Sequence, residues 1–251
     1  MNKIALVTGA SRGLGRNAAL AIARKGHDVV VTYRTGEAEA RQVVAEIERL
    51  GQAAIALKLD VGDVSSFAAF ATALSSALHE VWGRADFDFL INNAGHGAMA
   101  AFAETTEQQF DDLFNVHVKG VFFLTQALLP LIRDGGRIVN YSSGLTRVSF
   151  PGFSAYAAAK GAVEILTVYL ARELGSRGIA VNTVAPGAIA TDFLGGAVRD
   201  MPDLNAQFAG MTALGRVGVP DDIGPMVASL LAEDNRWVTG QRIEVSGGQV
   251  I

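Results

Sequence analysis

The chain has 251 residues and a formal net charge of −4, half of its residues are hydrophobic, and 28 are glycine. This length and composition suit one domain with a sizeable core, and the absence of cysteine excludes disulfides, a thiol nucleophile and zinc–cysteine sites. The chain is net acidic and has no dense run of lysine and arginine, so it lacks the charge pattern that is typical of nucleic-acid-binding proteins.

The sequence also carries no signal for a metal, a membrane or export. The four histidines (His27, His79, His96 and His117) show none of the short spacings at which metal ligands occur. No apolar run is long enough to cross a bilayer, and the apolar stretch after Lys3 is too short for a signal peptide. We therefore expect no bound metal, no membrane contact and a cytoplasmic location.

Short apolar runs alternate along the chain with longer amphipathic segments. Strands that are apolar along their whole length and are bounded by helices indicate a parallel sheet covered on both faces. The pattern predicts one doubly wound, Rossmann-type α/β domain over residues 1–251, with seven parallel strands. Strands are expected at 4–9, 29–33, 53–61, 87–95, 135–143, 178–187 and 242–248, and helices at 14–26, 37–51, 65–81 (capped by Ser65), 107–133, 155–175 and 219–234.

The first predicted strand runs into a glycine-rich loop that opens a helix, TGASRGLG at residues 8–15. Glycines let the backbone turn tightly and approach a pyrophosphate, which sits on the N-terminus of the helix. A loop of this kind between a strand and a helix at the start of a βαβ unit predicts a dinucleotide site. Its expected contacts are Gly9, Ser11, Arg12, Gly13, Leu14 and Gly15.

The loop spacing TGxxxGxG and several later motifs resemble the short-chain dehydrogenase/reductase family, in its single-domain branch. The resemblance covers nearly the whole chain. It implies a nicotinamide-dependent enzyme, commonly a tetramer or dimer, similar to 3-oxoacyl-carrier-protein reductases and to sugar, steroid and ketone reductases. The matching residues are NNAG at 92–95, Ser143 with the Tyr156-x-x-x-Lys160 pair as the catalytic set, and Pro186, Gly187, Ile189 and Thr191 in the nicotinamide segment.

The end of the second predicted strand bears on the choice of cofactor. An acid there would bind the adenosine ribose of NAD and would repel a 2′-phosphate. Tyr33 stands at that position, and Arg34 and Thr35 follow it. Arg34 and Arg12 could bind a 2′-phosphate with charge-assisted bonds, or both could be solvated surface residues. We expect NADP(H), with NAD(H) the less favoured alternative.

By resemblance, the ends of the third and fourth strands also contact the cofactor. Asp60 would bind the adenine amino group and Val61 would flank the ring, although an aspartate there could simply start a turn. Asn93 would stabilise the strand end, with Ala94 and Gly95 lining the ribose.

Tyr156 and Lys160 are four residues apart on a predicted helix, so their side chains share a face. A nearby ammonium stabilises a phenolate and lowers the pKa of a tyrosine, which can then exchange a proton with an alkoxide. Lys160 would also hold the nicotinamide ribose. Ser143, thirteen residues before Tyr156, would hydrogen-bond the substrate oxygen, with Ser142 as an alternative register. The predicted reaction is hydride transfer between a nicotinamide and a carbonyl carbon, with Tyr156 as proton donor.

The segment 192–215 interrupts the alternation and is rich in apolar residues, which predicts a substrate-binding lid or, alternatively, a short helix packed on the core. Phe150 and Phe153 would wall the same pocket. The apolar pocket suggests a ketone, aldehyde or 3-oxoacyl substrate, and Arg147 and Arg199 would suit an acidic carrier protein. Two other functions stay open: an NAD-dependent alcohol dehydrogenase, and a catalytically weak NADP-binding sensor.

His117 occupies an unusual place in the segment NVHVKG at 115–120. In the family that the chain resembles, the residue at this position, three before the glycine, is usually an asparagine. It helps to hold a water that links the catalytic lysine to solvent. His117 could preserve this proton relay, could be a packing substitution, or could mark lost activity. If the ring titrates, it would add an ionisation near pH 6–7 to the rate profile.

Overall fold

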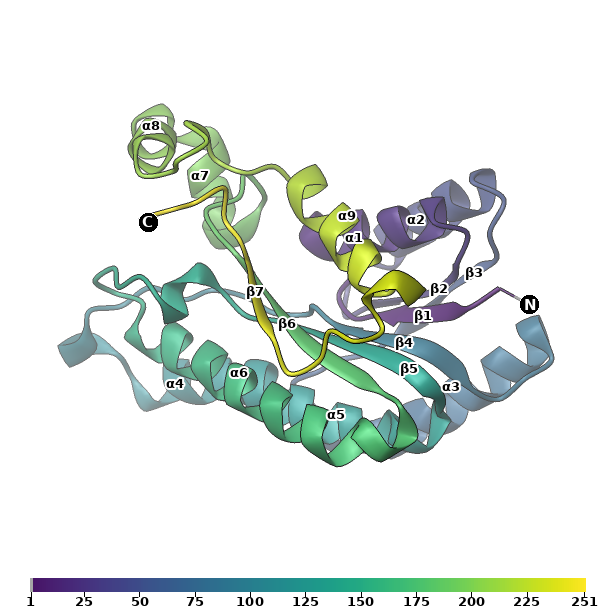
Figure 1. Ribbon diagram of the computed structural model, residues 1–251. Helices are drawn as coiled ribbons and strands as arrows, with labels where there is room; N and C mark the ends of the chain where they lie inside the picture. Colours follow the sequence, from purple (N-terminus) through teal and green to yellow (C-terminus); the bar gives the residue numbers. More distant parts are fainter. Residues whose placement is uncertain (1) are drawn as a thin grey trace.

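The computed structural model describes residues 2–251, which form a seven-stranded, all-parallel sheet in the order β3-β2-β1-β4-β5-β6-β7 (Figure 1). The order reverses between β1 and β4, where an open α/β sheet leaves a crevice at the carboxyl ends of its strands. The strands are β1 (Ile4–Val7), β2 (Asp28–Tyr33), β3 (Ala54–Lys58), β4 (Phe87–Asn92), β5 (Ile132–Tyr141), β6 (Ala180–Pro186) and β7 (Arg242–Val245).

Helices cover both faces of the sheet, so the predicted fold class is confirmed (Figure 1). On one face lie α1 (Gly13–Arg24), α2 (Glu37–Arg49) and α9 (Pro220–Leu230). On the other lie α3 (Phe67–Trp82), α4 (Glu107–Phe114), α5 (Val121–Leu128) and α6 (Ser154–Leu174).

The alternation of side chains along each strand divides the core into two layers. In β1, Ala5 and Val7 belong to the layer under α1, α2 and α9, whereas Ile4 and Leu6 belong to the layer under α3, α5 and α6. All four are at most 1% exposed, because a parallel strand between two others has no solvent face. This is why the strands read as continuous apolar runs.

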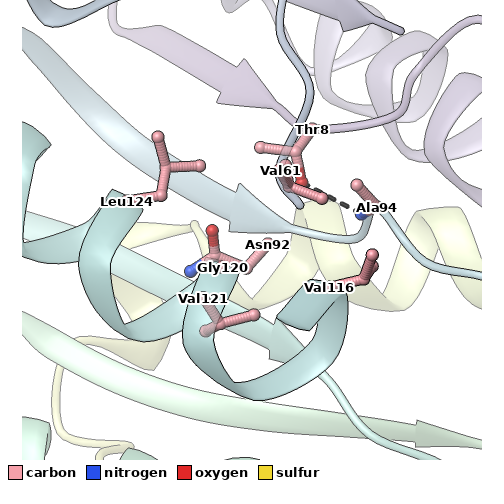
Figure 2. A pocket seen from close by; sticks show the side chains of 8 residues that line it. All are labelled: Thr8, Val61, Asn92, Ala94, Val116, Gly120, Val121 and Leu124. Atoms are coloured by element: carbon pink, nitrogen blue, oxygen red, sulfur yellow. Dashed lines mark hydrogen bonds between the residues drawn. The ribbon is translucent and has the colours of Figure 1, made fainter. Parts of the chain in front are cut away.

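The predicted helix 107–133 is not continuous. A π-helical turn, η3 (Asn115–Gly120), separates α4 from α5, and the chain then turns through η4 (Leu129–Leu131) into β5. Within this turn Gly120 approaches the chain after β3 closely, because a Cβ there would lie 2.2 Å from the carbonyl oxygen of Val61. Figure 2 shows this region, with Gly120 beside the end of β4 at Asn92. Apolar periodicity does not reveal one π turn, and such turns occur frequently at functional sites.

The expected cap of the third helix was wrong. Asp63, not Ser65, supplies the capping oxygen: its carboxylate accepts from the backbone N–H of Ser65 at 3.1 Å and from the Ser65 hydroxyl at 2.5 Å. The helical path therefore begins earlier, with the 3₁₀ turn η1 (Val64–Ser66) that leads into α3.

The segment 192–215 holds more regular structure than the loop-rich sequence suggests. It contains the turn η7 (Phe193–Gly196), α7 (Ala197–Asp200) and α8 (Pro202–Gly210). These helices lie at one end of the molecule, beside the C-terminus (Figure 1). The N–H groups of Ala213 and Leu214 donate to the carbonyls of Gly248 and Gly247, each at 3.1 Å. These bonds tie the segment to the stretch of chain that follows β7.

No helix within residues 2–251 has the length and apolarity that crossing a membrane requires.

The contact between α1 and α9 yields a stability prediction. A Cβ at Gly224 would lie 2.0 Å from Asn17 Oδ1 and 2.8 Å from its carbonyl oxygen. We expect Gly224→Ala to lower the free energy of unfolding by about 1–3 kcal/mol, because overpacking forces the two helices apart. Urea denaturation measures this change.

Gly210→Ala is the matched control, since a Cβ there meets no atom within 4 Å and the residue lies in helix α8. Alanine in a helix is favoured over glycine by up to about 1 kcal/mol, so this variant should be neutral or slightly stabilised. Equal unfolding midpoints for the two variants would show that α1 and α9 can separate without cost.

Candidate active site

A cleft of about 660 Å³ runs across the carboxyl edge of the sheet. It receives all the predicted catalytic residues and every predicted cofactor residue except Tyr33, whose ring is partly buried against the core under α1 and α2. The predicted residues that line it are Gly9, Ser11, Arg12, Gly13, Leu14, Gly15, Arg34, Thr35, Asp60, Val61, Asn93, Ala94, Gly95, His117, Ser143, Tyr156, Lys160, Pro186, Gly187, Ile189 and Thr191.

At one end of the cleft the glycine loop presents bare backbone before helix α1. Gly9 and Gly13 have φ values of 63° and 57°, a region that favours glycine. A Cβ at Gly15 would lie 2.4 Å from both the Gly9 carbonyl oxygen and Asn93 Nδ2. Asn93 in turn donates to the carbonyl of Thr8 at 2.8 Å, which joins β4 to the loop. This cradle fits a pyrophosphate on the N-terminus of a helix.

The adenosine end of the cleft contains charges of both signs. Arg12 and Arg34 are exposed and line it, as predicted. Glu39 lines it too, although the sequence did not single it out. Asp60 lies in the cleft and also starts a turn, because its Oδ1 accepts from the Gly62 N–H at 2.9 Å.

At the other end, Ser143, Tyr156 and Lys160 come together from two elements. Ser143 follows β5, whereas Tyr156 and Lys160 lie one helical turn apart on α6. Lys160 Nζ lies 5.7 Å from the centroid of the Tyr156 ring and donates to the carbonyl of Tyr141 at 2.8 Å. The Ser143 hydroxyl accepts from the Leu145 N–H at 3.2 Å and lies near enough to the Tyr156 phenol to affect its pKa. Both hydroxyls can therefore meet one substrate oxygen.

Burial, rather than the mutual effect of Lys160 and Tyr156, dominates the proton affinities here. Burial raises the pKa of Tyr156, and the nearby Ser143 hydroxyl opposes this rise. Burial lowers the pKa of Lys160 to about 7. The expectation that Lys160 lowers the pKa of Tyr156 is therefore not met in the chain alone. A raised pKa keeps the phenol protonated at neutral pH, which is the state a proton donor needs.

His117 lies in η3 with its side chain buried. Its Nε2 lies 2.7 Å from the carbonyl oxygen of His96, so Nε2 must carry a proton and donate it. Its ring meets the Tyr156 ring edge to face, with centroids 5.3 Å apart at 89°. A Cβ at Gly95 would lie 2.4 Å from His117 Cε1, so a glycine is needed beside the imidazole.

The ionisation of His117 differs from the hypothesis made from the sequence. Burial, followed by the charge of Lys160, places the pKa of its imidazole well below the ordinary value. Its Nδ1 is buried without a hydrogen-bond partner among the described residues. The ring is therefore neutral at pH 6–7, and the expected additional ionisation in that range does not fit this environment.

Several cleft residues escaped the sequence reasoning. His96 and Gly97 directly follow the NNAG motif, and that adjacency could have suggested them. A Cβ at Gly97 would lie 2.5 Å from Phe193 Cζ and 2.9 Å from Leu194 Cδ2, so the segment 192–215 packs onto this loop. The other lining residues that the sequence did not single out are Gly36, Leu59, Val116 and Tyr141, whereas Ser142 was the alternative register and Asp192 and Gly195 belong to the segment 192–215.

The two arginines proposed for an acidic carrier are already paired. Arg147 donates to Glu244 at 2.6 and 2.7 Å and to the carbonyl of Val250 at 2.8 Å. Arg199 is paired with Asp192 and Asp200. Because carboxylates of the same chain bind both guanidiniums, these arginines do not favour an acidic partner.

Because the pKa of His117 is lowered in the folded protein, the wild type and the His117→Asn variant should differ in how their stability depends on pH. Below its ordinary pKa of 6.5 the unfolded chain protonates this histidine while the folded chain does not, so its contribution to stability decreases as pH falls. The free energy of unfolding of the wild type should therefore fall more steeply than that of His117→Asn between pH 7 and pH 5.5. Urea denaturation at several pH values measures both, and parallel curves would contradict the neutral, buried ring.

Comparisons with known proteins agree with this architecture. Residues 9–249 match a family model described as enoyl-(acyl carrier protein) reductase. The chain is 42% identical over 246 residues to an uncharacterized oxidoreductase of Methylorubrum extorquens, covering 98% of this chain and 97% of that one. It is 35% identical over 260 residues to the tetrahydroxynaphthalene reductase PfmaG of Pestalotiopsis fici, covering 99% and 91%.

Two solved structures are also similar. The angucycline C-6 ketoreductase LanV with bound NADP has a TM-score of 0.93 and 41% identity, covering 99% of this chain and 95% of that chain. The reductase LugOII, which catalyses keto-reduction at C1 in lugdunomycin biosynthesis, has a TM-score of 0.94 and 39% identity, covering 99% and 98%. On its fold, its motifs and these relatives, the chain belongs to the short-chain dehydrogenase/reductase family.

Proposed function

We propose that this protein is an NADPH-dependent ketoreductase that converts a ketone into a secondary alcohol. One observation carries the proposal: a single cleft joins a phosphate cradle flanked by Arg12 and Arg34 to the hydroxyls of Ser143 and Tyr156. The NADP bound to LanV supports the choice of cofactor.

The chain's own residues would supply orientation and a proton. NADPH, when bound, supplies the hydride that reduces the carbonyl carbon. Ser143 and Tyr156 donate hydrogen bonds to the carbonyl oxygen, and Tyr156 transfers its proton to that oxygen as negative charge develops there. The raised pKa of Tyr156 holds the proton on the phenol until that moment. Lys160, buried beneath the ring, stabilises the phenolate that remains.

The aromatic walls favour a flat, ring-containing ketone as the substrate. The ring of Phe193 is tilted against that of Tyr156 with centroids 5.8 Å apart, and both rings line the cleft. Phe150 and Phe153, which the sequence placed in the pocket wall, do not line it. An aromatic substrate ring could pack against Phe193 as Tyr156 does. Two similar proteins, a tetrahydroxynaphthalene reductase and an angucycline C-6 ketoreductase, support the same class.

Residues 192–215 would act as the substrate-binding lid. Phe193 and Leu194 reach the cleft from this segment and pack on Gly97. Leu194 has φ 51°, an unfavourable value for leucine, and Gly195 and Gly196 follow with φ 70° and 85°. This short left-handed stretch would be the hinge on which Phe193 moves away when substrate enters.

The chain would also form a homodimer or homotetramer. α6 exposes Ile165 and Tyr169, at 63% and 64%, and α5 exposes Phe122 and Phe123, at 44% and 38%. Exposed apolar side chains on neighbouring helices are typical of a surface that is covered in an oligomer.

The first test of the proposal replaces the proton donor. Tyr156→Phe should lower kcat for ketone reduction by about 10²- to 10⁴-fold, because the transition state loses its general acid. NADPH consumption with fused-ring ketones measures kcat, and quenching of protein fluorescence measures NADPH binding, which should change little.

Tyr169→Phe is the matched control, since Tyr169 lies on the same helix outside the cleft and the change keeps its apolar ring. Binding of NADPH without reduction of any ketone by the wild type would favour the sensor alternative. Turnover restricted to NAD and secondary alcohols would favour the alcohol dehydrogenase, and turnover of enoyl compounds alone would favour enoyl reduction.

The second test concerns the cofactor's 2′-phosphate. Arg34→Asp should lower the ratio of kcat/KM for NADPH to that for NADH about tenfold to a hundredfold, since a hydrogen bond to a charged group contributes about 1.5–3 kcal/mol. Arg24→Asp makes the same charge change on an exposed residue at the end of α1. An unchanged ratio in Arg34→Asp would leave Arg34 without a role in cofactor selection.

A further inference from the structure

A half-buried carboxylate, that of Glu164, lies behind the catalytic serine. Glu164 is on α6, one turn beyond Lys160 and two turns beyond Tyr156. Its Oε1 accepts from the Ser142 hydroxyl at 2.6 Å and lies 2.7 Å from the Thr146 hydroxyl. The carboxylate therefore binds the chain on both sides of Ser143.

Arg242 completes this cluster from β7. Its Nε donates to Glu164 Oε1 at 2.7 Å, and its Nη2 donates to the carbonyl of Ser143 at 3.3 Å. The side chains of Glu164 and Arg242 are 19% and 25% exposed, so solvent screens their attraction only partly. The Thr146 hydroxyl lies 2.9 Å from the same Ser143 carbonyl oxygen.

The charges continue from this pair to the C-terminus. Arg242 Nη1 donates to Glu244 at 3.1 Å, and Glu244 accepts from Arg147 at 2.6 and 2.7 Å. Arg147 holds the carbonyl of Val250 at 2.8 Å. An alternating row of acid and base thus joins α6, the loop after β5, β7 and the C-terminal segment.

We propose that Glu164 is a positioning residue that, together with Arg242, fixes the Ser143 hydroxyl against Tyr156. This inference rests on the proposed ketoreductase function. Ser143 and Tyr156 lie on different elements, and Ser143 directly precedes the 3₁₀ turn η5 (Gly144–Thr146), whose own backbone bonds are local. Glu164 and Tyr156 lie on the same rigid helix. The bonds from Glu164 to Ser142 and Thr146 therefore hold Ser143, which lies between them, at a fixed distance from Tyr156.

The same contacts explain which of the two adjacent serines, Ser142 or Ser143, has a hydroxyl free to bind the substrate. Ser142 is 4% exposed, and its hydroxyl donates to Glu164. It is therefore occupied as an anchor, whereas the Ser143 hydroxyl lies near the Tyr156 phenol and affects its pKa. The alternation of the extended chain places the two side chains on opposite sides. Glu164 thus distinguishes the two adjacent serines.

The test is a double-mutant cycle between Glu164 and Ser143. Ser143→Ala alone should lower kcat about 10²- to 10³-fold, as expected for loss of one donor to the reacting oxygen. Glu164→Gln alone should lower kcat about tenfold or more, because a displaced donor is a weak donor. In the Ser143→Ala background, Glu164→Gln should change kcat less than about twofold, since the group that it positions is already gone.

Glu173→Gln is the matched control, an exposed glutamate on the same helix, and it should leave kcat unchanged in both backgrounds. The dissociation constant for NADPH, measured by fluorescence quenching, reports folding of every variant and should stay within about twofold of the wild type. Thr146→Val removes one of the same hydroxyl contacts and gives a milder second variant.

Equal losses of kcat from Glu164→Gln in both backgrounds would overturn the inference and leave Glu164 with a purely structural role. An unchanged kcat in Glu164→Gln and Thr146→Val would overturn it as well. If the wild type reduces no ketone, the proposed function fails instead, so the two failures are distinguishable.

Discussion

Close approach of bare backbone at the carboxyl edge of the sheet is the constraint on which this site depends. A Cβ at Gly15 would lie 2.4 Å from the Gly9 carbonyl oxygen, and one at Gly120 would lie 2.2 Å from that of Val61. A Cβ at Gly95 would lie 2.4 Å from the His117 ring. Each contact joins two strand ends or a strand end and a helix. Because glycine has no side chain, β1, β4 and η3 can approach one another closely enough at these positions to form one cleft.

The chemical end of the cleft combines deep burial with fixed polar contacts. Burial raises the pKa of Tyr156 and lowers those of Lys160 and His117, because it disfavours the charged form of each; Lys160, with a pKa of about 7, still carries its charge on a large fraction of molecules at neutral pH. Charge is instead concentrated behind the site, where Glu164 and Arg242 neutralise each other. This separation keeps the reacting groups in a medium of low dielectric while ion pairs hold the surrounding loops.

Much of the fold could be predicted because its signals are local. Seven apolar runs, the glycine loop and the Tyr156-x-x-x-Lys160 pair identify a doubly wound domain and both ends of the cleft, and all but one of the predicted site residues line it. Tyr33 was the exception, because its backbone ends β2 near the cleft while its ring turns to the core. The π turn η3 was missed, because apolar periodicity does not reveal a single turn with wider hydrogen bonding inside a helix.

The sequence by itself determined the succession of strands and helices along the chain, the glycine loop and the Tyr156-x-x-x-Lys160 pair, because each depends on neighbours within a few turns of chain. Only the tertiary structure decided the charge states and the partners. Arg147 looked available until Glu244 and Val250 were found bound to it, and His117 looked titratable until its burial was known. Burial and long-range pairing depend on which distant segments meet, and no spacing along the chain records that.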